Sequence, residues 1–228
     1  MKILASDFDN TIYFLEDEEK NKRNAFKINE FISNGNIFCI ITGRNYSDLK
    51  NYLKKYNILY TYLVCDDGAK IFNSVDYCLD TINLDRNTIE KTTYILDSIN
   101  ADYYLDDGYN KTTNINDCVK IVVNCTDDEE KERIVKLIKE KVNVHIYASR
   151  THVNIIEKSV NKEHALKRLL NIENLEYNKL YVIGDNDNDY EMLKTFNGAV
   201  IKEHHPKLNE LKKEEFNELN EYIDLLLH

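Results

Sequence analysis

The feature that most limits how this chain can fold is its alternation of short apolar runs with amphipathic stretches. The apolar runs are Ile3–Ser6, Ile37–Thr42, Tyr62–Cys65, Leu180–Gly184 and Ala199–Ile201. The helical patterns between them are centred on Lys22–Ser33, Tyr46–Tyr56, Glu163–Leu170 and Asp189–Thr195. Continuous apolar strands separated by helices are typical of a parallel sheet covered on both faces. The sequence therefore predicts an α/β fold with a doubly wound, Rossmann-like core.

The middle of the chain has a different pattern, from which we predict an inserted α+β cap domain. Helical patterns at Asn87–Ile99 and Asp128–Val142 mix with strand candidates at Val119–Cys125, Asn143–Ser149 and Val153–Glu157. A tight turn is expected at Asp107-Gly108. We place the first core segment at residues 1–73, the cap at 74–157 and the second core segment at 158–228. The final stretch, Pro206–Leu227, is predicted to form one amphipathic helix.

Composition excludes several classes of function. The chain is 43% apolar and 31% charged, as in ordinary globular proteins, and no apolar run approaches the roughly 20 residues of a membrane span. The first residues turn acidic at Asp7, too early for a secretory segment, so we expect a cytoplasmic protein. A net charge of −10 without a basic stripe argues against nucleic acid as a partner. The sequence does not specify an oligomeric state.

The five cysteines are expected to be buried reduced thiols. Their number is odd and no Cys-x-x-Cys occurs, which argues against a disulfide framework or a zinc site. The adjacent pair His204-His205 is also more typical of a surface loop than of a metal site.

Two carboxylates, Asp7 and Asp9, directly follow the first apolar run in the segment Asp-Phe-Asp-Asn-Thr. Ligands bind at the carboxyl ends of strands in open α/β sheets, which favours a functional role for this pair. Turns after strands also often contain Asp, so the pair alone is only a moderate signal.

Three further segments occupy comparable positions. Thr42 and Gly43 end the second apolar run, where a hydroxyl donor and close backbone approach suit an anion, although a plain turn would look the same. Lys162 stands at a predicted helix start, which is unfavourable for a cation unless it has an anionic partner; a surface lysine is the alternative.

The third segment is Gly-Asp-Asn-Asp-Asn-Asp at residues 184–189. Three aspartates within five residues repel one another, and a hard cation bound through oxygen resolves that repulsion. A helix cap held by Asp187 or Asn188 is the other interpretation, and we expect it for Asp187. Asp185 and Asp189 are the members that we expect to be functional.

Taken in order, the motifs Asp7-Phe8-Asp9-Asn10-Thr11, Thr42-Gly43-Arg44, Lys162 and Gly184–Leu193 resemble those of the haloacid dehalogenase-like (HAD) superfamily. The insert between the Thr and Lys motifs resembles the type IIB cap of its Cof-like subfamily. Two departures stand out. Asn10 replaces the glycine usual after the second Asp, but Asn tolerates unusual backbone angles. Asp66-Asp67-Gly68-Ala69 stands where the family often has Asn-Gly-Ala.

The resemblance implies a Mg²⁺-dependent phosphatase that hydrolyses a small phosphorylated metabolite, such as a sugar phosphate or a phosphorylated acid. It implies that Asp7 is the nucleophile, forming an aspartyl-phosphate, and that Asp9 is the general acid and base. Mg²⁺ would be bound by Asp7, the Asp9 backbone carbonyl and Asp185, with Asp189 orienting these ligands. The implied phosphate-binding residues are Thr42, Gly43, Lys162 and Asn188. The cap residues expected to contact the leaving group are Asp106, Asp107, Tyr109 and His152, and Arg44 is expected to pair with a carboxylate.

Two alternatives remain open from the sequence. A phosphomannomutase-like phosphosugar mutase would need a cluster of cap cations for a second phosphate, and the candidates are Lys111, Lys120, Arg133 and Arg150. A non-catalytic binding protein on the same fold would be favoured by the loss of a catalytic residue, but Asp7, Asp9, Lys162 and Asp185 are all present.

Overall fold

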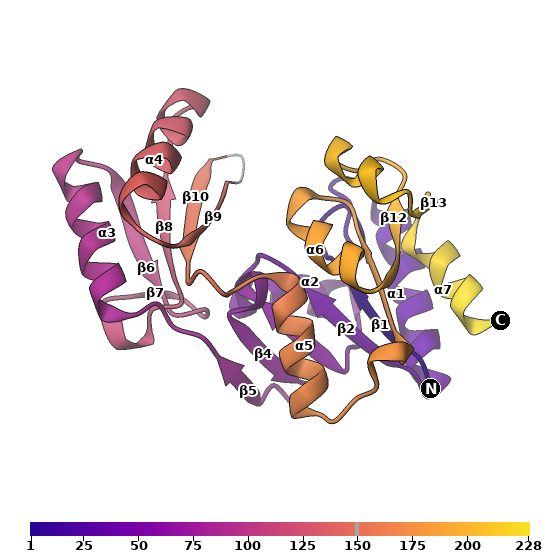
Figure 1. Cartoon of the computed structure of the whole chain (residues 1–228). Helices are drawn as coiled ribbons and strands as arrows, with labels where there is room; N and C mark the ends of the chain where they lie inside the picture. The colour runs from indigo at the N-terminus through magenta and orange to yellow at the C-terminus, as the bar shows by residue number, and fades with distance from the viewer. Residues whose placement is uncertain (149–150) are drawn as a thin grey trace.

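The computed structural model describes residues 1–148 and 151–228, which form a core and a smaller cap (Figure 1). Both termini lie in the core, whereas the cap comes from the middle of the chain (Figure 1). The predicted strand Asn143–Ser149 is therefore described only as far as Ala148, and Arg150 lies outside the described residues.

The described part of the core contains one eight-stranded sheet in the order β13-β12-β11-β1-β2-β3-β4-β5. These strands are β1 (Ile3–Ser6), β2 (Ile37–Ile41), β3 (Tyr62–Cys65), β4 (Lys70–Asn73), β5 (Cys78–Thr81), β11 (Leu180–Gly184), β12 (Asn197–Ile201) and β13 (Glu214–Phe216). The strands from β13 to β3 are parallel, and β4 and β5 extend the sheet in antiparallel fashion. The predicted parallel core is confirmed.

Helices cover both faces of this sheet. Helices α1 (Glu18–Ser33), α2 (Tyr46–Tyr56) and α7 (Leu219–Leu227) pack with Leu4 on one face. Helices α5 (Lys162–Ile172) and α6 (Tyr190–Thr195) pack with Ile3 and Ala5 on the other. Because successive side chains of a strand point to opposite faces, one apolar run supplies both cores. The predicted doubly wound arrangement is confirmed.

The cap is a second, antiparallel sheet in the order β7-β6-β8-β10-β9. Its elements are α3 (Arg86–Ser98), β6 (Asp102–Asp106), β7 (Lys111–Thr112), β8 (Lys120–Asn124), α4 (Asp128–Lys141), β9 (His145–Ala148) and β10 (His152–Ile156). Ile121, Val123 and Val153 pack in one apolar cluster with residues of α3 and α4. The alternate residues, among them Lys120, Val122 and Asn154, lie on the opposite face of the sheet, toward the core.

Two sequence-based assignments require correction. Residues 78–81, which our boundary at 74 gave to the cap, pair as β5 with β4 in the core sheet. We accordingly propose that the insert begins after Thr81. The single helix predicted over Pro206–Leu227 is wrong: a 3₁₀ turn (Pro206–Leu211), β13 and α7 replace it. Lys212, at φ 49°, has a left-handed backbone that a helix cannot continue through.

Two further observations bear on the class of protein. No helix among residues 1–148 and 151–228 combines the length and the low polarity that a membrane span requires. All five cysteines are free thiols, and four of them are buried.

Candidate active site

The order of the strands brings the predicted site residues together. Strands β11, β1 and β2 are neighbours, so their carboxyl ends place Asp185, Asp7 and Thr42 side by side. A cleft of about 1200 Å³ lies between this edge and the cap sheet. The predicted residues that line it are Asp7, Asp9, Thr42, Gly43, Lys162 and Asn188.

Lys162 connects two of the carboxylates. It begins α5 and is 1% exposed, with its Nζ atom 2.5 Å from Asp7 Oδ1 and 2.6 Å from Asp189 Oδ1. Burial lowers the pKa of Lys162, but the charges of Asp189 and Asp7 outweigh this effect and raise the pKa above its ordinary value. The sequence left a surface lysine open as an alternative, and the structure excludes it.

Asp7, Asp185 and Asp189 form a buried carboxylate cluster. Each offers an oxygen atom, and these atoms lie within 4.8 Å of one another. Burial raises the pKa of Asp7 well above its usual value although Lys162 opposes the shift, and burial together with Asp189 raises the pKa of Asp185 to about 6. Three such carboxylates beside one lysine form a site that favours an added cation. Their oxygen ligands fit Mg²⁺.

The hydrogen bonds of this cluster distinguish its members. Both oxygens of Asp189 are engaged: Oδ1 accepts from Lys162, and Oδ2 accepts from the backbone N–H groups of Asp185 and Asn186, each at 3.0 Å. Asp189 therefore fixes the loop, in keeping with an orienting role. Asp185 accepts a hydrogen bond from the Thr11 hydroxyl at 3.0 Å.

The loop after β11 is capped by a residue that we did not predict. The Asn186 side chain accepts from the backbone N–H of Asp187, whereas we expected Asp187 to hold this turn. Asp187 itself pairs with Lys207 at 2.5 Å. Asn10, in the loop after β1, has a φ of 57°, which confirms that it occupies a backbone conformation suited to Gly or Asn.

Asp9 is held by Arg44. The guanidinium donates from Nε to Asp9 Oδ2 at 2.8 Å and from Nη2 to Asp9 Oδ1 at 2.7 Å. Asp48 binds the other end of Arg44, which also stacks 4.4 Å from the centre of the Tyr52 ring. The expected pairing of Arg44 with a carboxylate is confirmed, and it orients the Asp9 carboxylate beside the cleft.

The phosphate-binding candidates surround one acidic residue that sequence reasoning did not assign. Thr42 Oγ1 accepts from the Arg44 backbone N–H at 3.2 Å, so its own proton is free to be donated. A Cβ at Gly43 would lie 2.9 Å from Asp67 Oδ2, and Asn188 Nδ2 donates to Asp67 Oδ1 at 2.9 Å. Asp67 thus contacts two of the predicted residues.

The cap contributes its polar face to the cleft. The cap residues that line it include Tyr104, Asp106, Lys120, His145, Tyr147, His152 and Asn154. Of the four cap residues singled out from the sequence, Asp106 and His152 are therefore in place. Asp107 instead accepts hydrogen bonds within its turn, and Tyr109 packs against Tyr46 and Phe72 of the core. The period-two alternation of the cap strands was the signal that could have identified the lining residues.

The candidate cations for a second phosphate are dispersed. Lys120 is buried and pairs with Asp66, while Lys111 lies over the Tyr104 ring at 4.1 Å. Arg133 is 3.8 Å from Glu130 on the exposed side of α4. Among the described residues, these three candidates do not form the cluster that a phosphosugar mutase would need.

The histidine pair after β12 is engaged in structural contacts. His204 Nδ1 lies 2.7 Å from the Ile201 carbonyl, and its Nε2 lies 2.9 Å from Asn209 Oδ1. The backbone N–H of His205 donates to the Asp185 carbonyl at 2.7 Å, which ties this loop to the carboxylate cluster.

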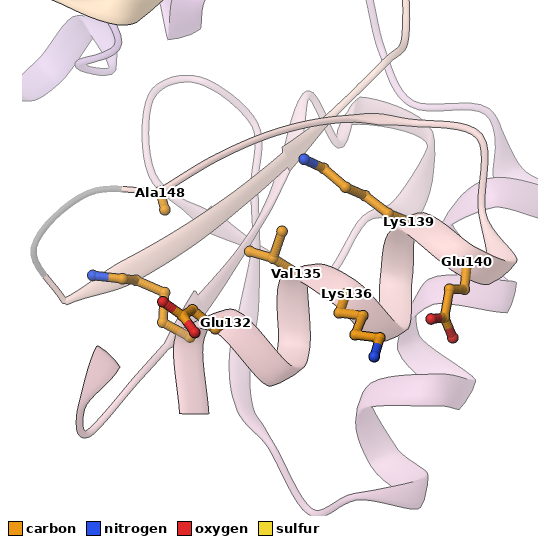
Figure 2. Close-up of a pocket in the computed structure, with 7 residues that line it drawn as sticks. Glu132, Val135, Lys136, Lys139, Glu140 and Ala148 are labelled. Carbon is orange, nitrogen blue, oxygen red and sulfur yellow. The ribbon is translucent and has the colours of Figure 1, made fainter. Parts of the chain in front are cut away.

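A second hollow, of about 570 Å³, lies between α4 and Ala148 of β9. Figure 2 shows Val135 and Lys139 rising from α4 toward the strands, whereas Lys136 and Glu140 point away. Val135 and Lys139 also line the main cleft, so the two spaces meet along this side of the cap.

The sequence model of haloacid dehalogenase-like hydrolases matches this chain over residues 4–110 and 95–222. The chain belongs to this family. The predicted recognition is thereby confirmed, and the motifs that we predicted to be catalytic fall within the matched residues. No curated protein matches the sequence.

Solved structures of HAD-like proteins share the whole fold. A putative HAD/COF-like hydrolase from Plasmodium vivax aligns with a TM-score of 0.85 and 19% identity, over 100% of this chain and 96% of its own. A haloacid dehalogenase-like hydrolase from Bacteroides thetaiotaomicron aligns with a TM-score of 0.82 and 14% identity, over 99% of both chains. A HAD subclass IIB sugar phosphatase aligns with a TM-score of 0.77 and 12% identity, over 100% of this chain and 98% of its own.

Proposed function

We propose that this chain is a Mg²⁺-dependent phosphatase that hydrolyses a small phosphorylated metabolite, such as a sugar phosphate or a phosphorylated small acid, through an aspartyl-phosphate on Asp7. The observation that carries the proposal is the position of Lys162, buried between Asp7 and Asp189 at the floor of the cleft. A buried cation touching a carboxylate is suited to keep that carboxylate ionised and to receive phosphoryl oxygens.

In the first step, an Asp7 carboxylate oxygen attacks phosphorus, and the bond from phosphorus to the ester oxygen breaks. Asp9 donates a proton to the departing oxygen, so the product leaves as an alcohol. Thr42, Gly43, Lys162 and Asn188 are the proposed contacts of the phosphoryl oxygens, because they lie on the same cleft wall.

In the second step, Asp9 takes a proton from a water molecule, which attacks phosphorus and releases inorganic phosphate and the Asp7 carboxylate. Arg44 orients Asp9 beside the cleft by binding both of its oxygens. Asp7 and Asp185 are the proposed side-chain ligands of Mg²⁺, with the Asp9 carbonyl as a third and Asp189 orienting them. When bound, Mg²⁺ supplies positive charge that neutralises the phosphate and favours in-line attack.

The position and lining of the cap favour a small substrate. Its sheet lies over the cleft and presents the polar groups of Tyr104, Tyr147 and Asn154 beside those of Asp106 and Lys120. Closure over the bound ester would exclude bulk water from the acyl phosphate.

The test is phosphate release from p-nitrophenyl phosphate and a panel of phosphorylated metabolites, with and without Mg²⁺. We expect Mg²⁺-dependent release by the wild type and none by Asp7→Asn. Asp187→Asn serves as the matched control, because it changes an aspartate of the loop after β11 that pairs with Lys207 outside the carboxylate cluster. Folded wild type that binds Mg²⁺ but releases phosphate from no ester would refute the proposal.

A further inference from the structure

Asp67 is a carboxylate in the cleft wall that the proposed mechanism does not use. It follows β3 and is 2% exposed, and it lines the cleft together with Thr42 and Lys162. Its backbone φ of 53° is in the left-handed region that non-glycine residues rarely adopt. The fold therefore keeps a carboxyl side chain at this position despite its burial.

One oxygen of this carboxylate has no hydrogen-bond donor. Oδ1 accepts from Asn188, but Oδ2 has no partner among residues 1–148 and 151–228 and is shielded from solvent. An ionised carboxylate can accept about four hydrogen bonds, and a buried acceptor without a donor is costly. Gly43 leaves the room that this oxygen occupies, since a Cβ there would lie 2.9 Å from it.

Two nearby donors, Lys162 and Tyr147, have other acceptors. Lys162 donates to Asp7 and Asp189. The Tyr147 hydroxyl of β9 donates to the Gly43 carbonyl at a long 3.5 Å. Burial raises the pKa of the Tyr147 phenol, and the nearby Asp67 adds to this shift through its charge and through a side-chain hydrogen bond with the phenol. A hydroxyl has one proton, so Tyr147 cannot fully satisfy both acceptors. Asp67 Oδ2 is therefore left without a donor that serves it alone.

We propose that Asp67 is a specificity-determining residue that accepts a hydrogen bond from a hydroxyl or ammonium group on the substrate's leaving group. The inference rests on the proposed phosphatase function and narrows its substrate class. The donor of the substrate takes the place of the Tyr147 hydroxyl beside Asp67 when the cap closes over it. A leaving group with a carboxylate or second phosphate at this point is disfavoured, because two negative charges would then share a buried site.

Four small phosphate esters of matched size test this directly: ethyl, 2-hydroxyethyl and 2-aminoethyl phosphate, and phosphoglycolate. We expect wild-type kcat/KM to be at least about tenfold higher for an ester with a donor than for ethyl phosphate, and lowest for phosphoglycolate. Asp67→Asn should reduce this preference, and it should raise kcat/KM for phosphoglycolate relative to that for ethyl phosphate. The hydroxyethyl and aminoethyl esters distinguish the two donors, since loss of the charge should affect the ammonium more strongly.

The control variant is Asp128→Asn, which removes the same charge from an exposed position at the start of α4. It should leave the ratios among the four esters unchanged. Equal wild-type kcat/KM for all four, or a uniform loss in a folded Asp67→Asn variant, would overturn the inference and leave the proposed function standing. If Asp67→Asn does not fold, the wild-type ratios alone decide. If the folded protein hydrolyses neither p-nitrophenyl phosphate nor any of the four esters, both this inference and the proposed function are overturned.

Discussion

Replacing Lys120 with Met should destabilise the protein strongly, because this residue joins the cap to the core. Lys120 Nζ lies 2.5 Å from Asp66 Oδ1, and the two side chains are 7% and 0% exposed. Burial raises the pKa of Asp66 to about 6 although Lys120 opposes the shift. Burial lowers the pKa of Lys120, but Asp66 and Asp106 outweigh it and raise the pKa.

The magnitude follows from what the substitution leaves behind. Asp66 Oδ2 has no hydrogen-bond partner among the described residues, so loss of Lys120 leaves both oxygens of a buried carboxylate unpaired. Removing one partner of a buried ion pair costs about 3–5 kcal/mol. In a chain of this size, that corresponds to a fall of roughly 10 °C in Tm.

Thermal and urea unfolding followed by far-UV circular dichroism at pH 8 measure this loss. Lys22→Met is the matched control, because it breaks an ion pair with Glu19 whose side chains are 62% and 75% exposed, and it should change Tm little. The double variant Lys120→Met/Asp66→Asn should recover much of the lost stability. A Tm for Lys120→Met equal to that of the control would refute the reasoning.

Four further predictions test other parts of the structure. In the folded state, burial raises the pKa of Asp66 to about 6, above its ordinary value in the unfolded chain. The folded state therefore loses the Asp66 proton as the pH rises from 4 to 7, and the contribution of this residue to stability falls over that range. The unfolding free energy of Asp66→Asn minus that of the wild type should therefore increase by about 2 kcal/mol over that range, and a constant difference in urea titrations would contradict this. Gly43→Ala, with its Cβ 2.9 Å from Asp67 Oδ2, should lose about 1–3 kcal/mol in urea unfolding and raise KM; unchanged values would argue against the crowding. Lys162→Met should lower kcat for p-nitrophenyl phosphate by at least about 10²-fold in protein shown to be folded, and near-wild-type turnover would exclude its role. Mg²⁺ should raise the Tm of the wild type but not of Asp185→Asn, and an equal rise in both would place the ion elsewhere.

The core and the positions of the site residues could be predicted because both depend on local patterns. Strands β3 and β11 were predicted to the residue, since each is a continuous apolar run buried on both faces. Asp7, Thr42 and Asp185 each follow such a run, and the parallel order of the strands then brings them to one edge.

The remainder depends on packing that has no periodic signal. Strands β5 and β13 are partly exposed edge strands without apolar alternation, so they were assigned to the cap and to a helix. The pair between Lys120 and Asp66 joins residues 54 positions apart. The partners of Asp67 likewise come from separate elements, and only the folded chain places Gly43 and Asn188 beside it.

Trapping the phosphoryl group on the protein tests most directly whether Asp7 is the nucleophile. The wild type and an Asp9→Asn variant, mixed with substrate and Mg²⁺, would be quenched in acid, digested and mapped by mass spectrometry. With p-nitrophenyl phosphate, whose nitrophenolate leaves without a proton from Asp9, we predict one added phosphoryl group on the peptide that contains Asp7, more abundant in Asp9→Asn because water is then activated poorly. Phosphate release by the wild type without a phosphorylated Asp7 peptide in either protein would contradict a covalent mechanism at this residue.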